Sequence, residues 1–434
     1  MIEHSGGKTP AGAGAIRQRR ILFALVGLYV AQGIPMYLFL VALPAILRED
    51  GLSLGSIGMI GLLMAPMMLK FLWAPMVDRR PVRLFGLARL GHRRSWIVPT
   101  QLGAVGLLVL FAFLPPTDMW VVIGLGFCII LLSSTQDIAT DGFATERLKA
   151  SQRARGNAVQ GGSVAIGVVI GSSLTLYLYS QYGWTPTILI LAGLSACTLL
   201  FTLLMDEPPA MAQAGQAAQA GQAGPRIESA GASLRGALQD PITYSVLGFA
   251  LIYRASEGIT RAMEKPFLVD NGLSLEVIGY LSGASAATAG LFGAALAAWT
   301  IRRAGLWQTI LGLGLLRTAV FFGCGLYAAF GLQVHGLLIA LVALNTVSRY
   351  MEIVALYSLF MGAAAKERAG TDFTLLSCAQ LFIFMAGSLI SGFLTDALGY
   401  AWLFGIATAL SLLSLWAALR RVPSSHPAMQ ITDH

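Results

Sequence analysis

Long apolar runs separated by short polar stretches recur along the whole chain. Twelve of these runs reach the roughly 20 residues that a helix needs to cross a bilayer. In the first half we expect spans at residues 21–47, 56–76, 96–115, 119–145, 157–180 and 184–205. In the second half we expect them at residues 241–269, 276–300, 306–330, 334–362, 372–395 and 400–419. The pattern therefore predicts an all-α membrane protein with twelve transmembrane helices.

Lys and Arg gather in alternate polar stretches, while the stretches between those are almost bare. They occur in the N-terminal tail, after the second, fourth, sixth, eighth and tenth spans, and in the C-terminal tail. Because loops rich in Lys and Arg stay in the cytoplasm, we expect both termini to be cytoplasmic.

A short repeat relates the two halves of the chain. The motif Gly-Leu-Ser-Leu-x-x-Ile-Gly at residues 51–58 recurs at residues 272–279, and each copy opens the second span of its half. Chance similarity is the alternative, since Gly, Leu and Ser are common in membrane helices. Two parallel six-helix repeats joined by a cytoplasmic linker are the plan of the major facilitator proteins. The expected parts are a cytoplasmic N-terminal tail (1–20), an N-terminal six-helix half (21–205), a flexible cytoplasmic linker rich in Ala, Gln and Gly (206–240), a C-terminal six-helix half (241–419) and a cytoplasmic C-terminal tail (420–434).

Composition narrows the function. Hydrophobic residues make up 56% of the 434 residues and charged residues only 12%, which excludes a soluble enzyme. The net charge is +8, and most of the Lys and Arg residues lie in the polar stretches between the apolar runs. There they set the orientation of the helices in the membrane, so we expect no nucleic-acid partner. The chain has no P-loop motif for ATP and no Cys-x-x-Cys pair, so we expect neither an ATP-driven pump nor a cofactor or metal site.

Nine charged residues nevertheless fall inside the predicted spans, away from the span ends. They are Lys70, Asp137, Asp141, Arg254, Glu257, Arg261, Arg317, Arg349 and Glu352. Each would cost about 3 kcal/mol if it faced lipid at the bilayer centre. Most must therefore face one another or a hydrated cavity, which is what a transporter requires.

Six of these charges lie in the second half and are mostly positive. Arg254, Glu257 and Arg261 have the spacing i, i+3, i+7, which places them on one face of a helix. Arg349 and Glu352 repeat the i, i+3 spacing, and Arg317 lies about midway along its span. Four positive and two negative charges suit an anionic substrate or an acidic group held by arginines. The alternative is that Arg–Glu pairs only lock helices together.

Two aspartates of the fourth span are the candidates for proton coupling. Asp137 and Asp141 have the spacing i, i+4 and share a helix face, with no basic residue beside Asp137 in its own span. Burial and a like charge nearby both favour the protonated form of a carboxyl group. We therefore expect Asp137 to bind and release a proton. Asp141 could do the same, or it could pair with loop arginines and stabilise the end of the helix.

The remaining candidates line the pathway or gate it. Lys70 lies near the predicted cytoplasmic end of the second span, and Asp78 and Arg79 follow at the start of a basic loop, so we expect a gate there. Lys70 has the alternative of reaching to the membrane surface. Gln32, Gln136 and Gln160 are candidates for lining a substrate cavity, and their alternative is hydrogen bonding between helices.

Two stretches resemble the AmpG-related branch of the major facilitator superfamily, which includes muropeptide permeases, acetyl-coenzyme A transporters and RhtX/FptX-type siderophore importers. They are Leu-Lys-Phe-Leu-Trp-Ala-Pro-Met-Val-Asp-Arg at residues 69–79 and Ser-Thr-Gln-Asp-Ile-Ala-Thr-Asp-Gly at residues 134–142. Ala-Gln-Gly-Ile-Pro at residues 31–35 and Ala-Gly-Thr-Asp-Phe-Thr at residues 369–374 resemble the siderophore importers more closely. The resemblance implies import driven by the proton gradient, and by position it assigns the coupling role to Asp137 and Asp141.

Our leading hypothesis at this point is a proton-coupled importer of iron–siderophore complexes in a bacterial inner membrane. The alternative is an AmpG-like importer of anhydro-muropeptides, and a third hypothesis is a transporter-like sensor or scaffold without flux. The expected partners are a small anionic or chelate substrate, protons and membrane lipid, and the expected form is a monomer.

Overall fold

The computed structural model describes residues 11–82, 84–147, 153–205, 207, 238–363 and 369–426. Among these residues, nine helices are long and apolar enough to cross a membrane by length and composition. Spans 1–6, 9 and 10 each account for one of them, and spans 11 and 12 together form the ninth. Most of the predicted linker, 206–240, and the ends of both predicted tails lie outside the described residues.

In the first half, several spans change from α-helix to π-helix or 3₁₀-helix along their length. Its elements are α1 (Ala11–Tyr37), the π-helix η1 (Leu38–Ala42) and α2 (Leu43–Glu49) in span 1; α3 (Leu54–Gly58), η2 (Met59–Met64), α4 (Ala65–Leu69) and η3 (Lys70–Leu72) in span 2, followed by α5 (Ala74–Arg79) and η4 (Leu84–Leu90); α6 (His92–Ala112) in span 3; α7 (Met119–Arg147) in span 4; α8 (Arg153–Val168), η6 (Val169–Leu174) and α9 (Thr175–Tyr182) in span 5; and α10 (Trp184–Cys197) and η7 (Thr198–Leu204) in span 6.

The second half contains two spans that are interrupted. Its elements are α13 (Pro241–Tyr253), α14 (Ala255–Arg261) and α15 (Glu264–Asp270) in span 7; α16 (Leu275–Ser282) and α17 (Ala284–Ala304) in span 8; α18 (Leu306–Ala329) in span 9; α19 (His335–Ala363) in span 10; and α20 (Ala369–Arg421), which holds spans 11 and 12.

Local backbone breaks explain why nine long helices correspond to twelve spans. Span 7 is interrupted at Arg254, with φ −92° and ψ −1°, and at Met263, with φ −90° and ψ −7°. Span 8 is interrupted at Gly283, which has φ −115° and ψ −77°. Within α20, Gly399 takes φ 80° and ψ 171°, a conformation open to glycine, and so separates spans 11 and 12. The twelve-helix fold predicted from the apolar runs is therefore confirmed.

Both copies of the Gly-Leu-Ser-Leu motif adopt the same conformation. Gly51 and Gly272 take positive φ angles of 83° and 78°, which close the preceding helices. Two residues later, Ser53 and Ser274 accept hydrogen bonds from backbone N–H groups of the next helices and so begin α3 and α16.

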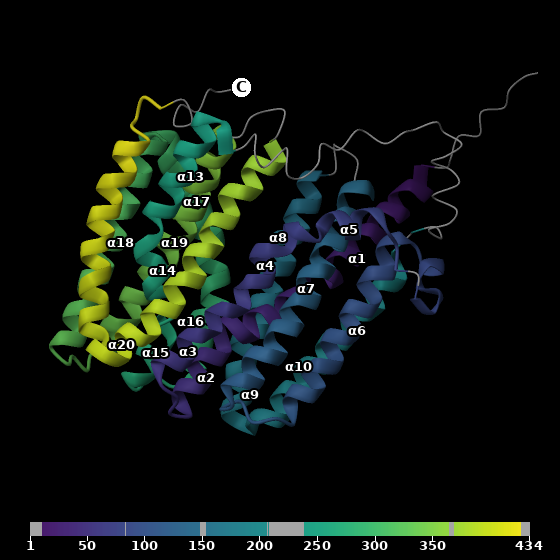
Figure 1. The fold of residues 1–434 in the computed structure, drawn as a ribbon, viewed down its shortest axis with the longest axis horizontal. Helices are drawn as coiled ribbons and strands as arrows, with labels where there is room; N and C mark the ends of the chain where they lie inside the picture. Colours follow the sequence, from purple (N-terminus) through teal and green to yellow (C-terminus); the bar gives the residue numbers. More distant parts are fainter. Residues whose placement is uncertain are drawn as a thin grey trace, which may run out of the picture.

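The two halves meet at the end of the molecule opposite the described ends of the chain, where α2, α3, α15 and α16 gather (Figure 1). The Asp396 carboxylate accepts hydrogen bonds from the N–H groups of Leu54, at 2.9 Å, and Gly55, at 2.6 Å. Arg48 pairs with Asp270 at 2.6 Å across the same seam. A Cβ at Gly58 would lie 2.6 Å from the carbonyl oxygen of Ser388, so spans 2 and 11 touch through backbone.

The buried apolar side chains follow the same division. One cluster joins the two halves near the seam and includes Ile46, Ile57 and Leu268. Toward the other end the clusters are separate, one in the first half around Ile97 and another in the second half around Phe249. The halves are therefore packed together at one end only.

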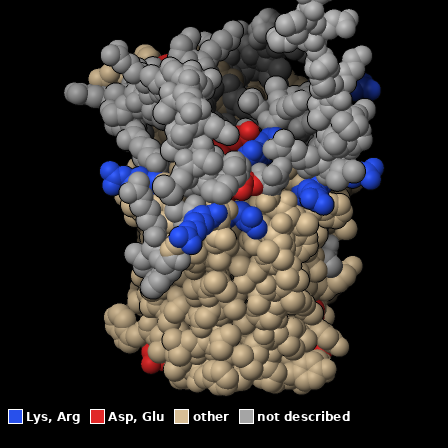
Figure 2. Space-filling view, turned by 90° about the vertical axis from the view of Figure 1, so that its right-hand side faces the viewer, with Lys and Arg blue, Asp and Glu red and all other residues tan. Residues whose placement is uncertain are grey.

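The surface has the pattern expected of a protein in a bilayer. On the face in Figure 2, Lys and Arg side chains form a band near the upper end, and a wide belt without charged side chains lies below it. A few acidic side chains mark the opposite edge of that belt. This distribution agrees with the uneven placement of Lys and Arg in the sequence.

Candidate functional site

A cavity of about 400 Å³ lies mainly against the first half. Residues of spans 1, 2, 4 and 5 line it, and Tyr357 reaches it from span 10 in the second half. Among the predicted site residues, Gln32, Asp137 and Gln160 are part of its lining. Tyr37, another polar residue of span 1, also lines the cavity. Sequence analysis missed Tyr29 and Tyr357, because a tyrosine in an apolar span gives no signal that separates it from core.

Asp137 has a cationic partner. The Lys70 ammonium lies 2.5 Å from Asp137 Oδ2, and about a quarter of each side chain is exposed. The sequence shows no basic residue beside Asp137 in its own span, and the structure agrees with that. The partner comes from span 2, so Lys70 points to the cavity-lining carboxylate and not to the membrane surface.

Among the described side chains, a hydroxyl group holds Asp141. Tyr29 donates a hydrogen bond of 2.8 Å to Asp141 Oδ1 from span 1. One turn away, Gln32 donates to the Thr140 hydroxyl at 3.1 Å, and Gln136 donates to the Leu28 carbonyl at 3.3 Å. Gln136 is buried, so it ties spans 1 and 4 together and does not line the cavity.

The predicted gate is described only in part. Asp78 and Arg79 belong to the helix α5, but their side chains lie outside the described part of the structure. Their gating role stays a prediction.

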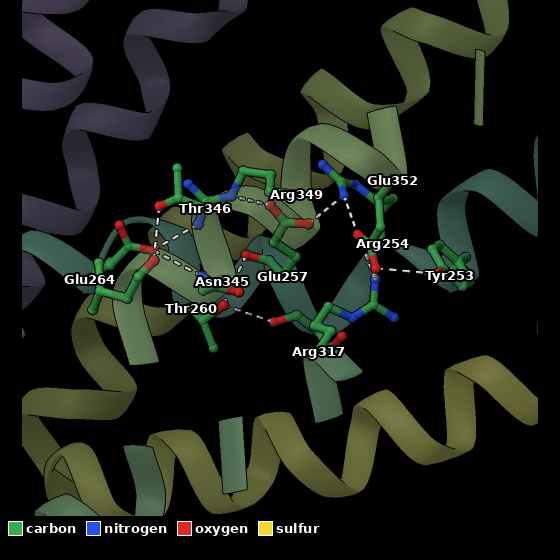
Figure 3. A network of polar contacts seen from close by, with 12 residues as sticks. Tyr253, Arg254, Glu257, Thr260, Glu264, Arg317, Asn345, Thr346, Arg349 and Glu352 are labelled. Atoms are coloured by element: carbon green, nitrogen blue, oxygen red, sulfur yellow. Dashed lines mark hydrogen bonds and ion pairs between the residues drawn. The ribbon is translucent and has the colours of Figure 1, made fainter. Parts of the chain in front are cut away.

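The second half contains a chain of ion pairs in which positive and negative side chains alternate (Figure 3). Along the chain the order is Lys265, Glu264, Arg349, Glu257, Arg254, Glu352 and Arg317. Its central distances are 2.7 Å from Arg349 Nε to Glu257 Oε1 and 2.6 Å from Arg254 Nη1 to Glu352 Oε2. Spans 7, 9 and 10 are joined by it.

The end of this chain at Arg317 is fully buried. Arg254 is 0% exposed, and Arg317 and Glu352 are each 1% exposed. Glu352 accepts from both arginines and also from the Tyr253 hydroxyl at 3.1 Å. Each of these buried charges therefore has a partner of opposite charge. This agrees with the alternative that Arg–Glu pairs lock the helices together.

Glu264 and Lys265 belong to the same chain but were missed from the sequence. Glu264 accepts from Arg349 at 2.7 Å and from Asn345 at 3.0 Å, and Lys265 lies 2.6 Å from its other oxygen. Both residues lie near the end of the predicted span 241–269, where charges were taken as belonging to the membrane surface. The i+7 spacing of Arg254 and Arg261 extends by i+3 to Glu264, and this was the available signal.

Arg261 differs from the other arginines of the second half. It has no ion-pair or hydrogen-bond partner among the described residues, and its side chain is exposed. Its guanidinium lies 4.5 Å from the centroid of the Phe384 ring, and it interacts electrostatically with the cavity-lining Tyr37. Arg254 lies 5.3 Å from the centroid of the same ring, so the two arginines face the same side of span 7, as their spacing predicts. The substrate-binding role of Arg254, Glu257 and Arg261 stays a prediction.

In the part of the chain that the structure describes, no group of three His, Cys, Asp or Glu side chains is arranged to hold a metal ion. Residues 25–371 match the family model described as Major Facilitator Superfamily. The chain belongs to the Major Facilitator Superfamily. It is therefore a multi-pass membrane protein and a secondary transporter, not an enzyme.

Named relatives within the superfamily fall in the AmpG-related branch. The chain is 24% identical over 396 residues to the anhydromuropeptide permease of Escherichia coli K12, covering 90% of this chain and 78% of the permease. It is 23% identical over 363 residues to the putative transporter AmpG 3 of Rickettsia prowazekii, covering 82% of this chain and 84% of that protein. An uncharacterized protein of Haemophilus influenzae is 27% identical over 305 residues, or 69% of each chain.

Solved structures of the superfamily share the fold. A bacterial homolog of the human lysosomal transporter Spinster, inward-facing and occupied, matches with a TM-score of 0.68 and 12% identity, covering 96% of this chain and 97% of the homolog. A POT family transporter in complex with a thioalcohol-conjugated peptide also matches with a TM-score of 0.68, at 11% identity, covering 92% of this chain and 96% of that transporter. In this superfamily the substrate site lies between the two halves, and here Asp137 of the first half and Tyr357 of the second half line the same cavity.

Proposed function

We propose that this chain is a proton-coupled importer of anionic sugar-peptides of the anhydromuropeptide class. The relatives named as anhydromuropeptide permeases support this substrate class. The observation that carries the proposal is Arg261, an unpaired and exposed guanidinium beside the cavity. Because a guanidinium binds a carboxylate through two parallel hydrogen bonds, it suits the acidic groups of a peptide.

The charge balance of the second half supports an anionic substrate. The interiors of spans 7, 9 and 10 carry five positive and three negative side chains. They are Arg254, Arg261, Lys265, Arg317 and Arg349 on one side and Glu257, Glu264 and Glu352 on the other. An excess of two positive charges inside a membrane protein is costly until anions approach it. A substrate with more than one negative charge would supply them.

The ion pair of Lys70 and Asp137 supplies a physical route to proton coupling. A proton on Asp137 would neutralise its carboxylate and leave the Lys70 ammonium without its counter-ion. An unpaired ammonium at the cavity attracts an anion more strongly in a medium of low dielectric constant. Proton and anion would then favour each other's binding, which is the thermodynamic requirement for symport.

We further place both termini in the cytoplasm of a bacterial cell and the protein in its inner membrane. The seam at Asp396 and Gly58 then closes the periplasmic side, and the described conformation faces inward. We also propose that the two six-helix halves extend over residues 21–205 and 241–419.

Iron–siderophore import is the second candidate. The stretches at residues 31–35 and 369–374 favour it, but the Escherichia coli relative reported above is named for anhydromuropeptides. Uptake into proteoliposomes distinguishes the candidates. We expect an imposed proton gradient to drive accumulation of labelled anhydromuropeptide and not of siderophores loaded with iron-55. Accumulation of a siderophore would reverse that order, and no flux of either would favour a sensor or scaffold.

Substitution of Arg261 by glutamine should weaken substrate binding. Loss of a charge-assisted hydrogen bond costs about 1.5–3 kcal/mol, so KM should rise by about tenfold to a hundredfold. The maximal rate should change little, since the coupling groups remain. Initial uptake rates over a range of substrate concentrations measure both constants.

The matched control is Arg19→Gln, which removes one exposed guanidinium at the start of span 1. An unchanged KM in Arg261→Gln, at equal surface expression, would remove Arg261 from the substrate site.

A further inference from the structure

A second hollow lies on the outer face of the second half, far from the cavity. It has a volume of about 360 Å³ and lies between α18 and the last part of α20. Six apolar or aromatic side chains line it: Trp307, Leu311, Leu412, Leu415, Trp416 and Leu419. In Figure 1 these two helices stand side by side at the edge of the second half, on the side away from the first half. The hollow, which we call the outer groove, therefore opens to lipid and not to the substrate path.

One end of the outer groove is positively charged. Arg420 belongs to its lining, is exposed, and lies 4.1 Å from the centroid of the Trp416 ring. Arg302 and Arg303 end α17, and the turn at Gly305, with φ 87°, joins them to α18 just before Trp307. None of these three arginines has an ion-pair partner among the described residues. The neighbouring Arg421 is already engaged, since its Nε donates to the Ser245 carbonyl at 3.1 Å.

No acidic side chain near these helices in the sequence balances this charge. Residues 277–351, which include α17 and α18, contain no Asp or Glu, and neither do residues 397–426. Each tryptophan lies four residues from one of these arginines along the chain, Trp307 from Arg303 and Trp416 from Arg420. Tryptophan is typical of the depth at which lipid headgroups meet acyl chains.

We propose that the outer groove is a binding site for an anionic phospholipid. An acyl chain lies along the leucines and the tryptophans, and the phosphate is bound by Arg420 with Arg302 and Arg303 beside it. A soluble anion would leave the apolar part of the groove unfilled, and a zwitterionic lipid would not compensate three unpaired guanidinium groups. Basic pockets between transmembrane helices on the cytoplasmic side favour anionic headgroups for the same reason.

Lipid retention by the purified full-length protein tests this site without any transport assay. The protein is titrated with phosphatidylglycerol or phosphatidylcholine, and bound lipid is counted by native mass spectrometry. The wild type should retain one phosphatidylglycerol at least about tenfold more tightly than phosphatidylcholine. Arg420→Gln should weaken that binding by about fivefold, because one arginine near a charged headgroup contributes about 1 kcal/mol.

Two further variants keep the result interpretable. Arg89→Gln removes an exposed arginine of the first half, and it should leave phosphatidylglycerol binding unchanged. Leu412→Trp fills the outer groove without altering charge, and it should expel the lipid. Equal retention of both lipids by the wild type, or unchanged binding in Arg420→Gln, would overturn the proposal. A shift from dimer to monomer in Leu412→Trp would also overturn it, since the groove would then be an interface between two copies. These lipid-binding outcomes do not depend on the proposed muropeptide transport, so the two proposals can fail separately.

Discussion

Replacement of Glu352 by glutamine is expected to destabilise the protein more than any other single change in the second half. Glu352 accepts from Arg254 at 2.6 Å and from Arg317 at 2.9 Å, and all three side chains are 1% exposed or less. Glutamine has nearly the same shape but carries no charge, so the buried Arg317 would lose its counter-ion and Arg254 would keep only Glu257. Breaking a buried ion pair from one side costs about 3–5 kcal/mol.

Thermal unfolding of the purified protein in detergent, followed by tryptophan fluorescence, measures this effect. The control Glu49→Gln changes an exposed carboxylate at the end of α2 and should leave Tm near the wild-type value. The double variant Glu352→Gln with Arg317→Gln should recover part of the loss, because it removes the guanidinium that has lost its counter-ion. A wild-type Tm in Glu352→Gln would show that the chain of ion pairs does not hold spans 7, 9 and 10 together.

The second large effect is expected at Asp137. Asparagine cannot bind the coupling proton and leaves Lys70 permanently without its counter-ion. Substrate should still bind and exchange, but a proton gradient should no longer drive its accumulation. One unit of pH gradient corresponds to about 1.4 kcal/mol, so a one-proton symporter should accumulate substrate about tenfold, and Asp137→Asn should not accumulate it at all.

Two assays on the same proteoliposomes separate the functions, namely net uptake under an imposed gradient and counterflow without one. Asp118→Asn, an exposed change between spans 3 and 4, should behave as the wild type in both. If Asp137→Asn still accumulates substrate against its gradient, the coupling carboxylate lies elsewhere, and Asp141 becomes the first candidate.

The positions of the spans could be predicted from the sequence because the thickness of the bilayer sets the length of every apolar run. The spacing of Arg254 and Glu257 also predicted an ion pair correctly, since i, i+3 neighbours on one helix lie within reach of each other. Arg349 and Glu352 have the same spacing but pair with other helices, because each has a partner in span 7. Within one helix, spacing determines which side chains can meet but not which partner each of them takes.

Contacts between spans were beyond prediction from a single sequence. Lys70 and Asp137 are 67 residues apart, and only the packing of span 2 against span 4 brings them together. Arg261 is exposed and Arg254 is buried although both lie on one side of span 7, and a single sequence does not show which neighbours cover each of them. Charged residues near the ends of spans, such as Glu264, were set aside because their depth depends on the tilt of the helix.

The alternating chain of charges bears on how the protein enters the membrane. Span 7 carries five charged side chains between residues 254 and 265, at about 3 kcal/mol each when unpaired in lipid. Its partners Arg317, Arg349 and Glu352 emerge from the ribosome about 50 to 100 residues later. Span 7 is therefore a poor insertion signal by itself and becomes stable in the bilayer only in the company of spans 9 and 10. Spans 7, 9 and 10 must therefore insert into the membrane together. In a nascent chain arrested before span 10, the insertion machinery must keep the charges of span 7 away from lipid.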